Sequence, residues 1–296
     1  MDSRPAAWAR LRVTGGHVAR VASMDQRAPR AGRTLHGMSL VLTEHGAFVG
    51  TITMNHPEKR NALSARLVAD LITAFEVMER ARTRVVILRA PPGTRVWSAG
   101  HDVQELPRGG RDPLGHGDPL RTVIRQIQSF PAPVIALLEG SVWGGACELA
   151  LTCDLVIAAP SVTFAITPAK LSVPYNVTGL LTFMNRMPLP ILKEMAFSGE
   201  PVDAARAHAL GIVNHVKAPE ELDAFVASMA QRIARNAPLT VSAMKKSIEI
   251  LAAASALPPI MFEQIQGERR RVWDSEDYRE GIAAFLERRE PKYRGE

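Results

Sequence analysis

Two glycine-centred segments, residues 98–102 (Ser-Ala-Gly-His-Asp) and residues 140–148, are the parts of the chain best suited to chemistry. Each comes after an apolar, β-branched run, residues 85–88 and residues 134–138, that predicts a buried strand. Glycine lets the backbone turn sharply and approach a ligand closely just past a strand. Two such turns can aim two backbone N–H groups at one oxygen atom. Such an oxyanion hole stabilises negative charge on a thioester or ester carbonyl, so the pattern predicts chemistry through an enolate or a tetrahedral anion.

Other interpretations of these residues meet their requirements less well. Glycines after strands also occur where they only permit tight packing of a strand against a helix, and this structural interpretation stays open. A phosphate-binding loop needs Lys and then Ser or Thr after its last glycine, whereas Gly145 is followed by Ala146 and Cys147. A serine hydrolase needs Gly-x-Ser-x-Gly, and Ser141 stands one place early. The eight histidines show no zinc-type spacing, so we expect no metal.

Together with their flanks, the two segments resemble the crotonase (enoyl-CoA hydratase/isomerase) superfamily. Residues 99–102 match its Ala-Gly-x-Asp motif, and Gly145 stands three residues before Glu148, as the corresponding family glycine stands before its glutamate. Residues 54–64 look like the segment that precedes the first helix of the family. Residues 237–239 (Ala-Pro-Leu), followed by a Lys-bearing stretch, look like the start of its C-terminal helical part.

The resemblance covers roughly residues 38–296 and carries several implications. It implies an α/β fold, a spiral of ββα units followed by a C-terminal helical oligomerisation region. It implies that the backbone N–H groups of His101 and Gly145 form the oxyanion hole. Because members of the family usually form trimers or dimers of trimers, we expect a homotrimer or a hexamer.

The acids and bases beside the proposed hole differ among family members and decide the reaction. Glu148 lies one helical turn after Gly145, so its carboxylate can point at the same site. The resemblance to hydratases puts Ala169 where they carry a second glutamate. Adding water across a double bond needs one group to activate the water and another to deliver a proton, and Glu148 alone is poorly equipped for both.

Residues 173–179 bring Tyr175 near the expected carbonyl site, and together with residues 106–114 they resemble the bacterial branch of the superfamily that decarboxylates methylmalonyl-CoA. Decarboxylation needs the breaking bond held perpendicular to the carbonyl plane and the enolate oxygen stabilised, but no base. The resemblance therefore implies a carboxy-lyase that forms propionyl-CoA and CO2 through a thioester enolate, with Tyr175 holding the departing carboxylate. Purely structural roles for Tyr175 and Glu148 stay open.

The resemblance also implies that the acyl group arrives as a coenzyme A thioester, with no separate cofactor. Lys59 and Arg60 match the place where the family binds the phosphates, and their charges suit phosphate oxygens. Ala62, Leu63 and Ala99 would contribute mostly backbone. The alternative is that Lys59 and Arg60 are only solvated loop charges.

Two other functions stay open. The chain could be an enoyl-CoA hydratase or isomerase that acts through Glu148, or a non-catalytic homologue that binds RNA through a basic arm. The net charge of +6 is concentrated in residues 1–37, which contain seven arginines and two acids. Because this segment lacks sustained periodicity, we expect a disordered leader, with Met38 opening the domain, and neither nucleic acid nor membrane as a partner.

Short strands alternating with helices favour an α/β layer architecture. We expect a hairpin over residues 40–54 with its turn at His45 and Gly46, and two helices that begin after the caps Ser64 and Asp118 and end near residues 79 and 128. Further strands are expected at residues 84–89, 133–138 and 155–159, and further helices at residues 144–151, 222–233, 241–251 and 260–273. We expect a leader over residues 1–37, a core over residues 38–235 and a helical region over residues 236–296.

The chain has no sequence signal for a membrane or for export. No stretch approaches the ~20 apolar residues that span a bilayer, and no signal-peptide core precedes residue 38. Cys147 and Cys153 stand six residues apart in one expected helix, which is poor geometry for a mutual disulfide. We therefore expect two reduced, buried thiols and a cytoplasmic location.

Overall fold

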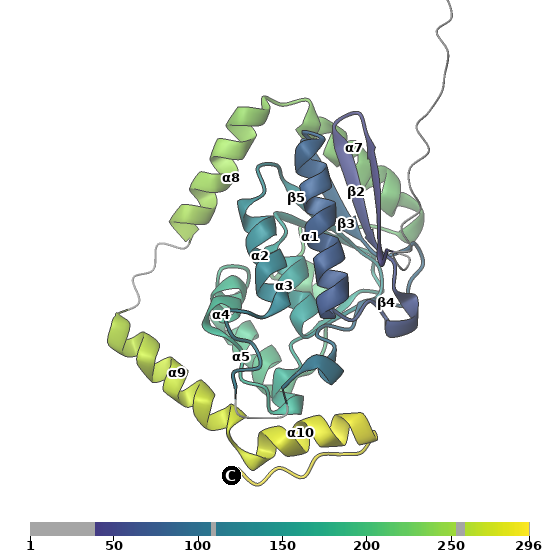
Figure 1. The fold of residues 1–296 in the computed structure, drawn as a ribbon. Helices are drawn as coiled ribbons and strands as arrows, with labels where there is room; N and C mark the ends of the chain where they lie inside the picture. Colours follow the sequence, from purple (N-terminus) through teal and green to yellow (C-terminus); the bar gives the residue numbers. More distant parts are fainter. Residues whose placement is uncertain (1–38, 108–110, 253–257, 296) are drawn as a thin grey trace, which may run out of the picture. The chain divides into compact units, whose positions relative to one another are not determined.

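The computed structural model describes residues 39–107, 111–252 and 258–295, which belong to one compact unit that starts at Met38 (Figure 1). The expected leader, residues 1–37, lies outside the described residues. Its disorder stays a prediction, as does the boundary between core and helical region at residue 236.

The larger sheet is mostly parallel. Within the described residues its strand order is β1-β2-β3-β5-β7-β10, and only β1 and β2 pair antiparallel. The strands are β1 (Val41–Gly46), β2 (Val49–Met54), β3 (Val85–Arg89), β5 (Val134–Leu138), β7 (Leu155–Ala158) and β10 (His215–Val216). β5 is buried along its whole length and β3 along all but its last residue, as parallel strands covered on both faces are. The apolar runs at residues 85–88 and 134–138 are therefore confirmed as buried strands.

A smaller sheet alternates with the larger one along the chain. In the described part its order is β4-β6-β8-β9, made of β4 (Val96–Ser98), β6 (Ser141–Trp143), β8 (Thr163–Ala165) and β9 (Val202–Asp203). β3, β5 and β7 are each followed by a strand of this smaller sheet and then by a helix. This is the ββα repeat that the sequence resemblance implied.

Helices cover both faces of the larger sheet. Figure 1 draws α1 (Ala65–Arg80) in front of the strands and α7 (Pro219–Ala234) behind them. α1 packs beside α2 (Pro119–Ser129), which in turn packs beside α3 (Gly145–Thr152). The Ser64 hydroxyl accepts a hydrogen bond from the Leu67 N–H, so the predicted cap of the first helix is confirmed. α4 (Val177–Met184), α5 (Leu189–Ser198) and α6 (Ala204–Ala209) follow the last ββ pair.

The turn of the first hairpin differs from the prediction. It lies at Ala47 and Phe48, with φ of 49° and 65°, whereas Gly46 is still in β1 and pairs with Val49. Two consecutive positive φ angles define the tight turn that matches the twist of a hairpin. The register is set by the strands rather than by the glycine, because the alternation in β2 buries Ile52 and Met54 completely.

The cysteine prediction needs one correction. Cys147 lies inside α3, but Cys153 is its C-cap rather than a helical residue, because the backbone turns into β7 at that point. Both thiols are free and fully buried. Burial raises the pKa of each to about 12, which keeps both protonated.

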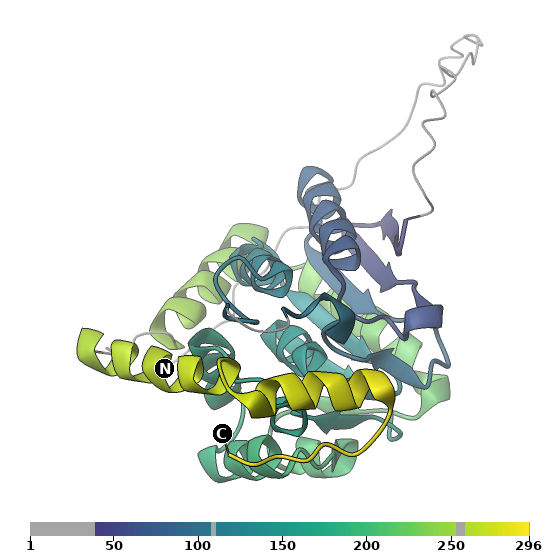
Figure 2. The ribbon, with the colours of Figure 1, turned by 60° about the horizontal axis from the view of Figure 1, so that its bottom comes forward.

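Buried basic side chains and a tyrosine tie the C-terminal helices to the rest of the unit. Lys245 of α8 (Pro238–Ala252) pairs with Asp154 at 2.8 Å. Arg269 of α9 (Pro259–Trp273) donates to the Tyr175 carbonyl at 3.0 Å. Tyr278 of α10 (Glu276–Glu287) donates to the Pro107 carbonyl at 2.6 Å. Figure 2 shows α9 and α10, in yellow, crossing the front of the view one after the other.

Candidate active site

The structure brings the two glycine-centred segments together. Gly100 follows β4 with φ of 81°, and a Cβ on it would collide with the Trp143 carbonyl and lie 3.1 Å from the Gly145 nitrogen. Only glycine fits this conformation and this close approach. The Gly100 carbonyl accepts a hydrogen bond from the Leu63 N–H at 2.7 Å, which fixes the turn from the other side.

Gly145 begins α3 immediately after the sharp turn at Gly144, whose φ is 53°. An N–H at the first helical position has no partner within its helix, and it lies at the positive end of the helix dipole. A Cβ on Gly145 would lie 2.5 Å from the His101 Nδ1 atom and 2.9 Å from the Leu120 Cδ2 atom. The backbone at Gly145 and the His101 residue are therefore direct neighbours, as an oxyanion hole built from both would require.

Asp118, at the start of α2, contacts both its own helix and the His101 ring. Asp118 caps α2 by accepting from the Leu120 N–H at 3.0 Å with one carboxylate oxygen. The other oxygen lies 2.9 Å from the His101 Nε2 atom. Asp118 is thus both a helix cap, as the sequence predicted, and the partner of the His101 ring, which the sequence did not indicate.

Glu148 is 1% exposed and forms an ion pair with Arg121 of α2, with 2.7 Å between Oε1 and Nη1. Burial raises the pKa of the Glu148 carboxyl, while the positive charge of Arg121 opposes that shift. Arg121 is itself buried, and sequence reasoning missed it because its partner is 27 residues away. The carboxylate predicted at the site is therefore already engaged by a cation.

Tyr175 precedes α4. Its hydroxyl is buried and forms no hydrogen bond of regular geometry in the part of the chain that the structure describes, although it is close enough to the Glu148 carboxylate to interact with it. Its ring packs edge-on against Phe183, with 5.2 Å between ring centroids. A Cβ on Gly179 would meet the Tyr175 ring and would lie 2.9 Å from the Glu148 Oε2 atom, so the two predicted side chains lie together. Burial, and then the Glu148 charge, raise the pKa of the phenol well above its usual value, which leaves it a neutral donor.

Arg269 of α9 is a second residue that the sequence did not reveal. It is 6% exposed and donates to the Tyr175 carbonyl from Nε and to Asp112 from Nη2, the latter at 2.6 Å. The segment that carries Tyr175 is therefore held by a helix almost a hundred residues later in the chain. No local sequence pattern announces such a contact.

The residues predicted to bind coenzyme A flank the Gly100 turn. Lys59 lies in the short helix Pro57–Lys59, and its ammonium pairs with Asp102 at 2.8 Å. Arg60 is exposed, and its carbonyl accepts from the Ala99 N–H at 3.0 Å. The predicted phosphate ligands thus lie beside the Gly100 turn, but the Lys59 charge is already shared with a carboxylate.

The two remaining predicted residues of this group, Ala62 and Leu63, are buried. Leu63 offers its backbone to Gly100, as described above. The described residues contain no group of three or more His, Cys, Asp or Glu side chains that could hold a metal ion. Nor do the described residues include a helix with the length and apolar character of a membrane span.

The family follows from a comparison with known proteins. A family model described as enoyl-CoA hydratase/isomerase matches residues 44–296. The chain belongs to this family. Its α/β layers and repeated ββα units are the crotonase-like fold that the sequence predicted.

Three individual proteins show which members of this family the chain resembles. Methylmalonyl-CoA decarboxylase of Escherichia coli (strain K12) is 48% identical over 247 residues, which cover 83% of this chain and 95% of the relative. A methylmalonyl-CoA decarboxylase solved in complex with 2-nitronate-propionyl-CoA is similar in structure, with a TM-score of 0.85 at 46% identity over 87% of this chain and 99% of that chain. The bovine mitochondrial enoyl-CoA hydratase domain-containing protein 2 is 33% identical over 278 residues, which cover 90% of each chain.

Proposed function

We propose that this chain is a carboxy-lyase that converts methylmalonyl-CoA to propionyl-CoA and CO2. The observation that carries the proposal is the buried Tyr175 hydroxyl, which forms no hydrogen bond of regular geometry with the described residues and lies beside the Glu148 carboxylate. A buried hydroxyl without a partner costs free energy, so it points to a group that the substrate supplies. The likeness to methylmalonyl-CoA decarboxylase supports the same reaction.

The oxyanion hole in this proposal consists of the backbone N–H groups of His101 and Gly145. The thioester oxygen accepts from both while the C–C bond to the carboxylate breaks and its electron pair passes into the enolate. Because backbone donors are fixed before the reaction begins, they stabilise the developing charge without having to reorganise. The N-terminus of α3 adds a favourable dipole at the same oxygen.

Tyr175 holds the carboxylate that leaves. Its neutral phenol donates a hydrogen bond to a carboxylate oxygen and sets the rotamer in which the breaking bond is perpendicular to the thioester plane. In this proposal Phe164, Val173 and Trp143 form the apolar surround of the carboxylate; the first two are buried and Trp143 is partly so. An apolar surround disfavours the charged carboxylate relative to neutral CO2, which favours loss of CO2.

Hydration or isomerisation through Glu148 is the competing reaction in the family. Ala169, in the position where the resemblance places a second hydratase glutamate, is an exposed residue that cannot exchange protons. Glu148 is engaged by Arg121 at 2.7 Å. The site therefore suits a reaction that needs no base better than one that needs two acid–base groups.

Lys59 and Arg60 hold the coenzyme A phosphates in this proposal, with backbone contacts from Ala62, Leu63 and Ala99. Coenzyme A enters as part of the substrate, and the reaction uses no other cofactor. Phosphate binding requires Lys59 to share its ammonium between Asp102 and a phosphate oxygen, which its 47% exposed side chain allows.

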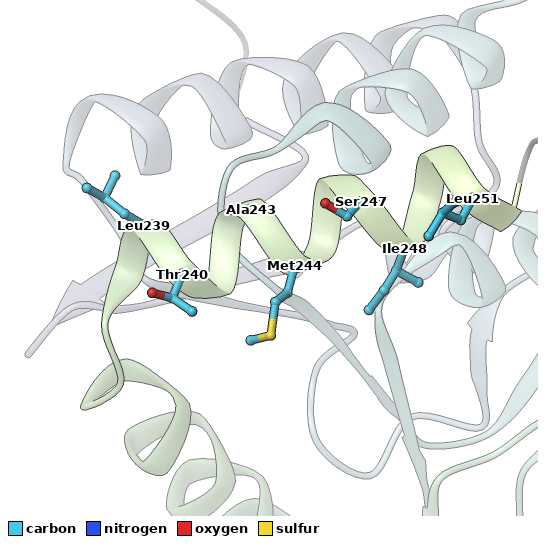
Figure 3. A pocket seen from close by; sticks show the side chains of 7 residues that line it. All are labelled: Leu239, Thr240, Ala243, Met244, Ser247, Ile248 and Leu251. Carbon is cyan, nitrogen blue, oxygen red and sulfur yellow. The ribbon is translucent and has the colours of Figure 1, made fainter.

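The protein acts as a trimer or as a dimer of trimers in the cytoplasm. Support for association comes from α8, whose own side chains line the pocket drawn in Figure 3. Its lining consists of Leu239, Thr240, Ala243, Met244, Ser247, Ile248 and Leu251. Four of these are large apolar side chains at least half exposed, and so contiguous an apolar surface is typical of an interface.

A panel of four thioesters tests the proposal. Malonyl-, methylmalonyl-, ethylmalonyl- and crotonyl-CoA are each offered to the purified chain, and CO2 release or hydration is measured. We expect kcat/KM for methylmalonyl-CoA to exceed that for crotonyl-CoA by a wide margin. Comparable values for these two substrates would overturn the decarboxylase assignment in favour of a hydratase that uses Glu148. No turnover, together with an RNA gel shift that depends on residues 1–37, would favour the non-catalytic alternative.

A further inference from the structure

The proposed mechanism assigns no role to the buried ion pair between Arg121 and Glu148. Decarboxylation needs no base, yet Glu148 lies one helical turn from Gly145 and so on the same face of α3 as the proposed oxyanion hole. A free carboxylate there would be able to remove a proton from the carbon beside the carbonyl. The pair therefore stands where a side reaction could begin.

Contacts in the first turn of α2 fix the position of Arg121 beside Glu148. Asp118 caps the helix and holds the His101 ring, and Leu120 lies against Gly145. Arg121 comes next in the same first turn, and its Nη1 atom reaches Glu148 at 2.7 Å. Both side chains of the pair are buried, at 8% and 1% exposure, so water screens their attraction poorly.

We propose that Arg121 is a positioning residue that sets reaction specificity by holding Glu148 away from proton transfer at C2 of the bound acyl group. The inference rests on the proposed function, because it takes the acyl-CoA thioester to be bound at the His101 and Gly145 amides. It adds a reason why a family member that keeps this glutamate need not act as a hydratase or an isomerase.

The side reaction balances as a simple proton exchange. The C2–H bond of propionyl-CoA breaks, its electron pair enters the enolate, and the proton passes to a Glu148 carboxylate oxygen. In D2O the carboxyl exchanges that proton for a deuteron. The deuteron then returns to C2 while the enolate collapses to the thioester, so the net change is one hydrogen replaced by deuterium.

The charged and titratable groups around Glu148 come from three sides. Arg121 and Asp118 belong to α2, His101 follows β4, and Tyr175 precedes α4. Of these groups Arg121 has the strongest opposing influence on the pKa of Glu148. Without it, burial would raise that pKa further and make the ionised carboxylate a stronger base. The gained exchange would then increase with pH, as the buried carboxyl ionises.

The test compares Arg121→Met with the unaltered chain. Methionine keeps an unbranched apolar stem and removes the cation. We expect incorporation of deuterium at C2 of propionyl-CoA, followed by NMR in D2O, to rise about tenfold or more and to increase with pH. Decarboxylation of methylmalonyl-CoA should continue in the same variant. The double variant Arg121→Met/Glu148→Gln should lose the gained exchange. Arg125→Met removes an exposed arginine of the same helix and should leave both rates unchanged.

Unchanged exchange in folded Arg121→Met, or a gain that persists in the double variant, would overturn the inference. Removing one partner of a buried ion pair can unfold a protein. Should Arg121→Met not fold, Arg121→Gln keeps a hydrogen-bond donor without the charge, and the same two outcomes apply to it. Decarboxylation by the unaltered chain tests the proposed function separately, since propionyl-CoA exchange does not depend on loss of CO2.

Discussion

Replacing Tyr175 with phenylalanine gives the most direct test of the proposed chemistry. The hydroxyl forms no hydrogen bond of regular geometry in the described part of the chain, so within the folded protein its removal costs only its interaction with the Glu148 carboxylate. The ring stays, and with it the edge-on contact with Phe183 at 5.2 Å. A hydrogen bond from this hydroxyl to the substrate carboxylate is worth roughly 1.5–3 kcal/mol, because one partner is charged. Decarboxylation should therefore fall on the order of 10- to 100-fold.

The assay measures propionyl-CoA formed from methylmalonyl-CoA, beside thermal unfolding and propionyl-CoA affinity for the same variant. Propionyl-CoA has no carboxylate, so its affinity should change little. Tyr278→Phe is a matched comparison, because the Tyr278 hydroxyl donates to the Pro107 carbonyl at 2.6 Å. That variant should lose about 1 kcal/mol of stability or more, with a smaller effect on the rate than Tyr175→Phe. An unaltered decarboxylation rate in Tyr175→Phe, or an equal loss of propionyl-CoA affinity, would refute the role of the hydroxyl.

Three further outcomes are expected. Gly145→Ala and Gly145→Pro both place a Cβ 2.5 Å from His101 Nδ1, but only the proline variant also loses the backbone N–H. The proline variant should therefore lose ~3 kcal/mol more in kcat/KM than the alanine variant. Equal losses in the two variants would place the hole elsewhere. A variant without residues 1–37 should keep its kcat and its oligomeric state by light scattering, whereas loss of either would show that this segment joins the body. Because folding raises the pKa of Glu148, protonation of this carboxyl stabilises the folded state. The stability of the unaltered chain relative to Glu148→Gln should therefore be greatest below the ordinary carboxyl pKa and should decline as the pH rises through the raised pKa. Denaturation measured over a range of pH checks this.

Local sequence patterns were sufficient for most of the elements that carry the site. Ser64 and Asp118 cap the helices as expected, because a cap bonds to N–H groups only two or three residues away. The buried strands were evident from continuous apolar runs. Three-residue strands such as β4 were not, because so short a segment has no measurable periodicity. The hairpin turn was placed two residues early, since Gly46 is the better turn former while cross-strand burial sets the register.

The chemistry could be predicted as far as residue types determine it. Gly100 and Gly145 follow strands at the spacing of the family motif, and Glu148 lies one turn later, so the residue order alone points to the candidate hole and its carboxylate. Those features are local: they depend on φ angles, helical spacing and the order of residues along the chain.

The partners of these groups could not be predicted in that way. Arg121 reaches Glu148 across the contact between α2 and α3, and Arg269 reaches the Tyr175 carbonyl from a helix near the end of the chain. The sequence predicts a helix cap at Asp118 whether or not the second carboxylate oxygen contacts His101. Such contacts depend on how helices distant in sequence pack, and that packing sets the burial, and so the pKa, of each charged group. The order of residues along the chain was therefore enough to identify the candidate reacting groups, whereas their burial and their pairing depend on the three-dimensional packing.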